Sequence, residues 1–305
     1  AIIYISLRME EIFQIGNRVT VLRDGRWVGK SLVSELDTDQ LIRMMVGRSI
    51  ENQFPKADFS NLEKKEVLRV ENLCRGDHVK NVSFSVRTGE ILGIAGLVGA
   101  GRTEVARLIF GADRPSSGDI YLNGKKAVLR SPKDAIAQGV ALLPEDRKYQ
   151  GLVLKHSVEW NSTIVALQKL MNRFRLLDRK KERQDIQSAV QRFRIAVNDV
   201  ASPVSSLSGG NQQKVVIAKW MYADADIVIF DEPTRGIDVG AKTEVYEVMN
   251  DLIRQGKAVV MISSEMPELR GMCDRILTMR MGEISGEFDN REPISEDELL
   301  KEMIE

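Results

Sequence analysis

The sequence predicts an α/β fold, in which buried strands end in turns that carry glycine or acidic residues. The first observation is an apolar strand over residues 90–96 that runs into a glycine-rich turn and then a helix. The second is an apolar strand over residues 227–230 that ends in Asp231 and Glu232. Because α/β proteins place their sites at the carboxyl ends of such strands, both turns are candidate functional positions. A third observation, an internal repeat, predicts how the chain is divided.

The composition limits the chain to a few classes of protein. With 305 residues, 43% of them apolar, it can hold one large domain or two ordinary ones. Its 44 basic and 44 acidic residues give no net charge, which argues against a nucleic-acid partner. Cys74 and Cys273 form neither a disulfide framework nor a metal-binding spacing. No segment approaches the roughly 18–20 apolar residues of a membrane span, so we expect a soluble, cytosolic chain that meets a membrane only through a partner.

Two segments repeat each other at an offset of 257 residues, with residues 1–11 aligned to residues 258–268. Each copy has the pattern of a buried strand, a short helix and two strands around a glycine turn. The repeat predicts that residues 1–54 are the C-terminal tail of an upstream domain and that residues 66–305 form a second domain. The chain would then begin inside a domain, and the polar residues 52–65 would act as a linker.

The glycine-rich turn has the frame of a phosphate-binding loop, GxxxxGK[ST], with Arg102 in the lysine position. Backbone amides of such a turn bind phosphates, and Thr103 offers a hydroxyl to Mg²⁺. Arginine retains the positive charge, but its planar head is not equivalent to the compact ammonium group of lysine. An ordinary dinucleotide-type turn is the alternative interpretation. The predicted nucleotide-binding residues of this turn are Gly96, Gly99, Gly101, Arg102, Thr103 and Glu104.

The most distinctive segment of the chain is LSGGNQQK at residues 207–214, called here the signature segment. Its two glycines allow a backbone to approach a phosphate without a Cβ in the way. The helix that follows would direct the positive end of its dipole at an anion. For the LSGG run alone, a serine-capped helix start is the alternative. The predicted phosphate-binding residues here are Ser208, Gly209, Gly210 and Gln212.

The chain resembles the tandem ATP-binding subunits of ABC importers for monosaccharides of the ribose, galactose and xylose type. The resemblance rests on GLVGAGRT, PEDRK, LSGGNQQK, DEPTRGID and ISSEMPE, which follow one another in this order. It implies a P-loop NTPase of ABC type, with a RecA-like core, an antiparallel β subdomain and a helical subdomain at about 151–205. A small α/β remnant of an upstream copy would precede this domain. Periodicity alone leaves residues 151–205 open, because any amphipathic helix pair would give the same pattern.

The same resemblance assigns roles at the strand ends. Glu232 is implied as the general base that acts on water, and Thr103 and Asp231 as ligands of Mg²⁺. Asp238 falls in the D-loop, residues 234–238, which in this family crosses to the opposite domain. ATP and Mg²⁺ are therefore the implied cofactors.

Three positions depart from the usual ABC pattern, although the second domain of the tandem importer subunits typically has the arginine and lacks the switch histidine. Arg102 replaces lysine, Glu145 replaces the glutamine that senses the γ-phosphate, and Ser264 replaces the switch histidine. Glu145 and Ser264 remain candidates for nucleotide contact, although Glu145 could equally lie in a solvated turn. Leu7 stands at the histidine position of the upstream copy. These replacements predict a weak or non-hydrolysing site in this domain, and an intact signature segment that serves a nucleotide held by another ABC half.

The implied function is ATP binding and hydrolysis coupled to monosaccharide uptake through a separate membrane permease. The implied partners are the transmembrane permease subunits, a complete ABC ATPase half and, indirectly, a periplasmic or extracellular sugar-binding protein, with no nucleic acid. The implied location is cytoplasmic, peripheral on the inner face of the cell membrane. Two alternatives stay open, a non-transport ABC ATPase and a non-hydrolysing regulatory half that only binds nucleotide.

Overall fold

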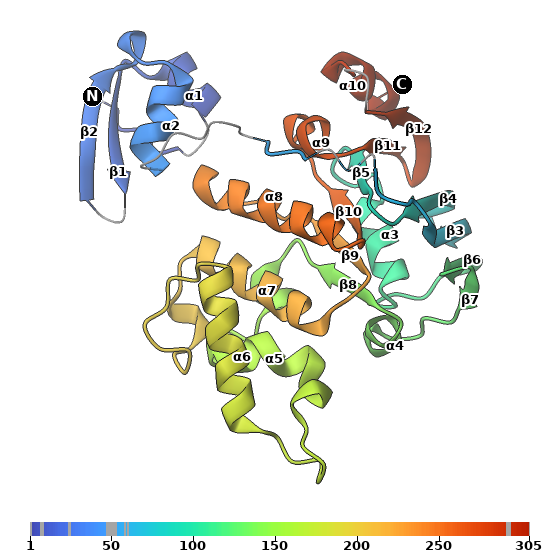
Figure 1. Cartoon of the computed structure of the whole chain (residues 1–305). Coiled ribbons are helices and arrows are strands. Elements are labelled where there is room, and N and C mark those ends of the chain that lie inside the picture. Colours follow the sequence, from blue (N-terminus) through green and yellow to red (C-terminus); the bar gives the residue numbers. More distant parts are fainter. Residues whose placement is uncertain are drawn as a thin grey trace.

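The computed structural model describes residues 2–6, 9–23, 26–46, 54–57, 59, 61–290 and 294–304 (Figure 1). A small N-terminal unit, drawn in blue, is joined by a connecting segment to a larger α/β unit. Leu7, which aligns with Ser264, lies outside the described residues. Within the described ranges, no helix has the length and apolar character needed to cross a bilayer.

A six-stranded sheet forms the centre of the larger unit. Its spatial order is β12 (Glu283–Asp289), β11 (Arg275–Arg280), β5 (Ile91–Gly96), β10 (Ala258–Ile262), β9 (Ile227–Asp231) and β8 (Val140–Leu143). All of its strand pairs are parallel except the one between β11 and β12. Every residue of β5, β9 and β10 is buried, because helices cover both faces of a parallel sheet. The helices beside it are α3 (Arg102–Ile109), α4 (Pro132–Ala137), α8 (Val239–Arg254), α9 (Met266–Met272) and α10 (Glu296–Ile304).

The second sheet is antiparallel. Its order is β4 (Val79–Arg87), β3 (Glu66–Arg75), β6 (Ser117–Leu122) and β7 (Lys125–Ala127). Buried and more accessible residues alternate along β4, so one face of this sheet joins the common core. At the β3–β4 turn, the Lys80 amide donates to the Gly282 carbonyl at 2.7 Å, which ties this sheet to the β11–β12 turn. The predicted antiparallel β subdomain is confirmed.

The segment between β8 and β9 is helical, as predicted. It begins with a π-helical turn at Arg147–Gly151 and continues with α5 (Val158–Thr163), a 3-10 helix at Ile164–Leu170 and α6 (Arg179–Arg192). After a second 3-10 turn at Val204–Ser206, α7 (Gly209–Ala223) leads back to the sheet and packs against α5. Figure 1 shows this helical subdomain as a layer below α8.

Lys219 on α7 gives a prediction about stability and pH. Its ammonium donates to the Gly151 carbonyl at 2.6 Å, and burial lowers the pKa of Lys219 from 10.5 to about 8. The folded state therefore loses this proton at a lower pH than the unfolded state, and the cost of the buried charge is relieved as the pH rises from about 8 to 10.5. We expect Lys219→Met to be stabilising near pH 7. Urea unfolding at several pH values should show this advantage shrinking by up to about 1.4 kcal/mol per pH unit across that window.

The N-terminal unit repeats the C-terminal end of the larger unit. Its elements are α1 (Met9–Ile15), β1 (Arg18–Arg23), β2 (Arg26–Leu32) and α2 (Thr38–Val46). The bounds of α1, β1 and β2 match those of α9, β11 and β12 at an offset of 257, and α2 matches α10 at 258. A hydrogen bond repeats as well, because Ser6 donates to Glu11 at 2.6 Å and Ser263 donates to Glu268 at 3.1 Å.

One prediction for this unit is wrong, since residues 2–6 form no strand. Ile2, Ile3 and Ile5 are more than 90% exposed, although the matching segment, β10, is buried. β10 is a strand because it pairs with β5 on one side and β9 on the other. Residues 2–6 pair with no strand in the described part of the chain, and an apolar run without a neighbour has no ladder to join.

The connecting segment contacts the larger unit, although its polar composition predicts a linker without such contacts. The Phe54 ring packs on Tyr246 of α8 with centroids 5.7 Å apart, and the Pro55 carbonyl accepts from Asn250. Lys56 donates to the Cys273 carbonyl at 2.5 Å. Residues 54–56 are therefore fastened to the larger unit near α8 and α9.

Candidate functional site

The phosphate loop lies between β5 and α3. Gly99 and Gly101 have φ values of 85° and 100°, in the left-handed region that favours glycine. A Cβ on Gly101 would lie 2.4 Å from the His78 carbonyl oxygen, so this turn has no room for a side chain. Gly96 is similarly confined by the Met279 carbonyl, at 2.8 Å. The loop thus presents backbone amides at the positive end of α3, which is the arrangement that binds phosphate groups.

Arg102, the first residue of α3, points inward instead of into solvent. Its side chain is 9% exposed, and its Nη1 donates to the Ser263 carbonyl at 2.8 Å. Its Nη2 lies 3.4 Å from Oε1 of Glu232. The cation that should meet a phosphate is therefore paired with the residue predicted to be the general base.

Glu232 follows β9 and has a left-handed φ of 46°. Ser264, at the end of β10, donates to its Oε2 at 3.2 Å. Burial raises the pKa of Glu232, while the Arg102 cation acts in the opposite direction. The carboxylate thus lies between Arg102 and Ser264. A serine hydroxyl has no titration near neutral pH, so Ser264 lacks the acid–base chemistry of the histidine that it replaces.

Asp231 and Thr103 form the second pair at the strand ends. Asp231 is 1% exposed, and this burial raises the pKa of its carboxyl to about 6, although the neighbouring Thr103 hydroxyl acts in the opposite direction. Its Oδ1 atom is buried without a hydrogen-bond partner among the described residues. A buried carboxylate oxygen without a donor, beside a hydroxyl, suits a hard cation such as Mg²⁺, which prefers oxygen ligands. Glu104, in the first turn of α3, adds a further acidic group nearby.

The signature segment begins α7, where Ser208 is the N-cap. The Ser208 hydroxyl accepts from the Asn211 side chain at 2.9 Å and remains exposed. Gln212 is buried, and its amide donates to the Val204 and Leu207 carbonyls at 3.3 and 3.2 Å. Gln212 therefore holds the loop before α7 in place, whereas Ser208 is accessible to a ligand.

The D-loop lies against this first turn of α7. Asp238 caps α8 by accepting from the Ala241 amide at 3.0 Å, and a Cβ on Gly210 would lie 3.6 Å from its Oδ2. The carboxylate of Glu145 forms an ion pair with Arg235 and, among the described residues, makes no contact with Thr103 or Asp231. The predicted residues therefore separate into two groups. Those around the phosphate loop are Gly96, Gly99, Gly101, Arg102, Thr103, Glu104, Asp231, Glu232 and Ser264, and those around the start of α7 are Ser208, Gly209, Gly210, Gln212 and Asp238. Glu145 follows β8 and contacts the D-loop through its ion pair with Arg235.

Sequence reasoning missed a buried carboxylate that joins these groups. Glu268 is 1% exposed and accepts from Thr234 of the D-loop at 2.7 Å and from Lys242 of α8 at 2.8 Å. It also accepts from Ser263, whose carbonyl holds Arg102. The repeat offered a signal for this role, because Glu11 aligns with Glu268.

His78 also gains importance from the structure. The sequence suggests an incidental residue, yet its carbonyl lies against Gly101 and Gly282, so the β3–β4 turn borders the phosphate loop. No sequence pattern indicated this contact, because it joins two different sheets.

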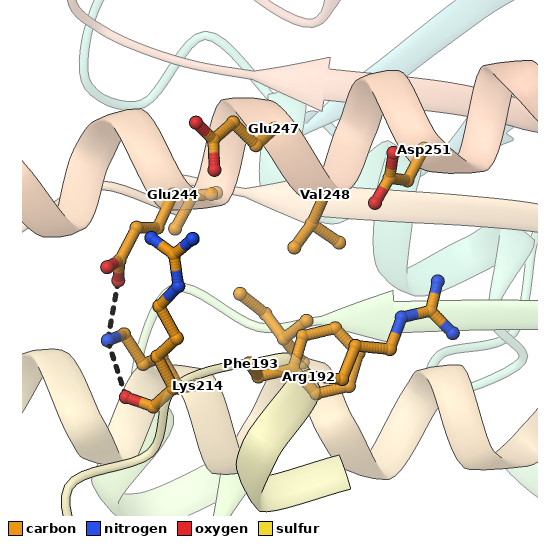
Figure 2. A pocket seen from close by; sticks show the side chains of 10 residues that line it. Arg192, Phe193, Lys214, Glu244, Glu247, Val248 and Asp251 are labelled. Carbon is orange, nitrogen blue, oxygen red and sulfur yellow. Dashed lines mark hydrogen bonds and ion pairs between the residues drawn. The ribbon is translucent and has the colours of Figure 1, made fainter. Parts of the chain in front are cut away.

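A cavity of about 230 Å³ lies elsewhere, between the end of α6 and helices α7 and α8 (Figure 2). Lys214 pairs with Glu244 at 2.5 Å across it and donates to the Arg194 carbonyl at 3.0 Å. None of the residues predicted to bind nucleotide lines this cavity. The candidate nucleotide site is thus the open turn at the strand ends, and not this cavity.

The comparisons with known proteins agree with this geometry. A family model described as ABC transporter matches residues 79–235, just over half of the 305-residue chain. A dimeric ATP-binding cassette bound to ADP and Pi superposes with a TM-score of 0.64 at 20% identity, over 74% of this chain and 99% of that one. The predicted P-loop NTPase fold of ABC type is therefore confirmed.

Two curated relatives are similar over nearly all of this chain. The ribose import ATP-binding protein of Clostridium tetani is 50% identical over 301 residues, which are 98% of this chain and 59% of that protein. A ribose import ATP-binding protein of Rhizobium meliloti is 49% identical over 287 residues, which are 94% of this chain and 57% of that protein. The chain thus spans about three fifths of the length of these relatives.

Proposed function

Since this chain belongs to the ABC transporter family, we propose that it is the ATP-binding part of an importer for a ribose-type monosaccharide. The observation that carries the proposal is the identity of about one half to ribose import ATP-binding proteins over 94–98% of this chain. The assembly would include a transmembrane permease at the cytoplasmic face and a sugar-binding protein outside. ATP binding and hydrolysis would then drive sugar uptake.

ATP with Mg²⁺ is the proposed ligand of the phosphate loop. The amides of residues 99–103 would bind the phosphates, and Thr103 and Asp231 would hold the metal, because Asp231 has a buried oxygen without a donor. Bound Mg²⁺ neutralises the charge that develops on transferring phosphates. The first turn of α3 fixes the Thr103 hydroxyl, and the end of β9 fixes the buried Asp231 carboxylate.

This domain's own site is proposed to bind nucleotide but to hydrolyse it weakly. Arg102 Nη2 lies 3.4 Å from Glu232 Oε1, so the carboxylate would have to leave this cation before it could accept a proton from water. Ser264 cannot relay a proton as histidine does, and Glu145 is engaged by Arg235. The non-hydrolysing half considered as an alternative is favoured by these same contacts.

The signature segment is proposed to close on a nucleotide held by an upstream ABC domain, of which residues 1–54 are the tail. The matching bounds of α1, β1, β2 and α2 with those of α9, β11, β12 and α10 support this division. The exposed apolar side chains of residues 2–6 support it too, because their counterparts in β10 are buried between two strands.

The weak site is tested by Glu232→Gln in the full tandem protein. We expect ATP turnover to stay within about twofold of wild type, because removing a base that takes no part in hydrolysis does not change the rate. The control is the same change at the matching glutamate of the upstream domain, which should abolish turnover. A loss of nearly all activity in Glu232→Gln would contradict the proposal.

Transport itself is tested by reconstituting the full protein with its proposed permease in membrane vesicles. We expect uptake of labelled ribose, galactose or xylose that depends on ATP and on the matching binding protein. Uptake of none of these, combined with active ATP turnover, would favour the non-transport ABC ATPase instead.

A further inference from the structure

Arg147 belongs to the PEDRK run, yet no role in nucleotide binding explains its contacts. Its Nη1 donates to the Arg235 carbonyl at 2.9 Å, and its Nη2 donates to the Gly236 carbonyl at 3.3 Å. Glu145, two residues earlier, pairs with the Arg235 side chain. The loop after β8 thus binds the D-loop at two kinds of group, the backbone carbonyls of Arg235 and Gly236 and the side chain of Arg235.

The Nη2 atom of Arg147 also lies close to the signature segment. A Cβ on Gly209 would lie 2.8 Å from Arg147 Nη2 and 3.5 Å from the Gly236 carbonyl oxygen. The guanidinium therefore lies between the D-loop and the first turn of α7. A glycine at position 209 leaves it the necessary space, and a planar head with several N–H groups can serve two carbonyls at once.

The backbone that carries Arg147 is itself fixed. Asp146 accepts from the amides of Lys148 and Tyr149 at 3.0 and 3.1 Å, which caps the π-helical turn. At the far end of that turn, Lys219 of α7 donates to the Gly151 carbonyl at 2.6 Å. The turn is thus attached to α7 through Lys219 and contacts its first turn through Arg147, so Arg147 is held in a defined place relative to the signature segment.

We propose that Arg147 is a positioning residue that sets the D-loop against the first turn of α7, so that Ser208 and its neighbours meet the opposite nucleotide correctly. This rests on the proposed function of the signature segment. Arg147 acts through the backbone carbonyls of Arg235 and Gly236. Since Glu145 occupies the γ-phosphate-sensing position, the same loop connects this domain's own site to the site that the signature segment completes.

The first test measures ATP turnover by the full tandem protein with Arg147→Ala and Arg147→Lys. We expect kcat to fall about tenfold in both, because lysine keeps the charge but not the two-carbonyl geometry, while the KM for ATP stays within about twofold. Guanidinium ion at low millimolar concentration should restore part of the kcat of Arg147→Ala. Lys148→Ala, an exposed change in the same turn, is the matched control and should keep wild-type kinetics.

A wild-type kcat in Arg147→Lys would overturn the assignment, because a point charge would then suffice. A fall in kcat that guanidinium does not rescue, with an equal fall in melting temperature, would also overturn it, as a simple loss of stability.

The second test needs no activity and uses this chain. Hydrogen exchange at the amides of residues 209–211 and 235–238 should be faster in Arg147→Lys than in wild type and in Lys148→Ala. Unchanged exchange would overturn the role of Arg147 even if the full protein transports sugar. Conversely, faster exchange together with a wild-type protein that neither hydrolyses ATP nor transports sugar would support the role of Arg147 and reject the proposed function.

Discussion

Replacing Ser208 with arginine is expected to lower ATP turnover by the full tandem protein about a hundredfold, the effect of removing a key donor from a phosphate-stabilising site. Ser208 is the exposed N-cap of α7, and its hydroxyl is accessible at the positive end of that helix. A long side chain there would occupy the space of the opposite γ-phosphate. Steady-state release of phosphate at saturating ATP measures the effect.

The control is Ser205→Arg, which places the same side chain at an exposed position three residues earlier. It should leave turnover unchanged. Because Ser208→Arg loses only a helix cap, its melting temperature should fall by a few degrees at most. Turnover within about threefold of wild type in a folded Ser208→Arg protein would refute a composite site built on this segment.

Replacing Asp231 with asparagine is expected to stabilise the nucleotide-free protein by about 3 kcal/mol at pH 7, while abolishing its stabilisation by Mg²⁺ and ATP. Burial raises the pKa of Asp231 from 3.8 to about 6, so the folded state holds this proton more tightly than the unfolded state. The cost of the buried carboxylate is absent below pH 3.8, accumulates up to about pH 6 and is complete at pH 7. Asparagine keeps the shape without the charge.

Urea unfolding at pH 5 and pH 7 checks this sign, since the advantage of Asp231→Asn should be smaller at pH 5. Asp226→Asn is the matched control, because Asp226 is an exposed carboxylate just before the same strand, β9. A variant less stable than wild type at pH 7 would show that Asp231 is stabilised by its surroundings and is not strained by burial.

The fold was predictable because its motifs fall at strand ends. The glycine turn after Gly96 and the acidic pair after Phe230 each mark the end of a buried strand, and β5 and β9 end there. Burial on both faces requires continuous apolar runs, and such runs are visible in sequence. Local chemistry and global packing agree at these positions, which is the condition under which sequence reasoning succeeds.

The contacts of long side chains were not predictable. Arg102 donates to a carbonyl 161 residues further along the chain, and Glu145 pairs with Arg235 across two loops. Each of these side chains has many rotamers, and the partner is chosen by the tertiary arrangement. Sequence motifs therefore indicate which residues gather at the site but not which of them pair with each other.

The strand expected at residues 2–6 shows a different limit. Its apolar pattern is nearly that of β10, yet in the described part of the chain β10 has a neighbouring strand on each side and residues 2–6 have none. A strand forms only when a neighbouring strand is there to pair with, so similar apolar patterns give different structures in different surroundings.

In the ligand-free protein, Glu232 occupies the Arg102 guanidinium that a bound phosphate would need. A phosphate that binds Arg102 would compete with the Ser263 carbonyl and the Glu232 carboxylate for the same guanidinium. Because the pair is buried, salt screens this exchange little. We therefore expect the ion pair between Arg102 and Glu232 to reform whenever such a phosphate leaves, so that the ligand-free loop has one resting arrangement.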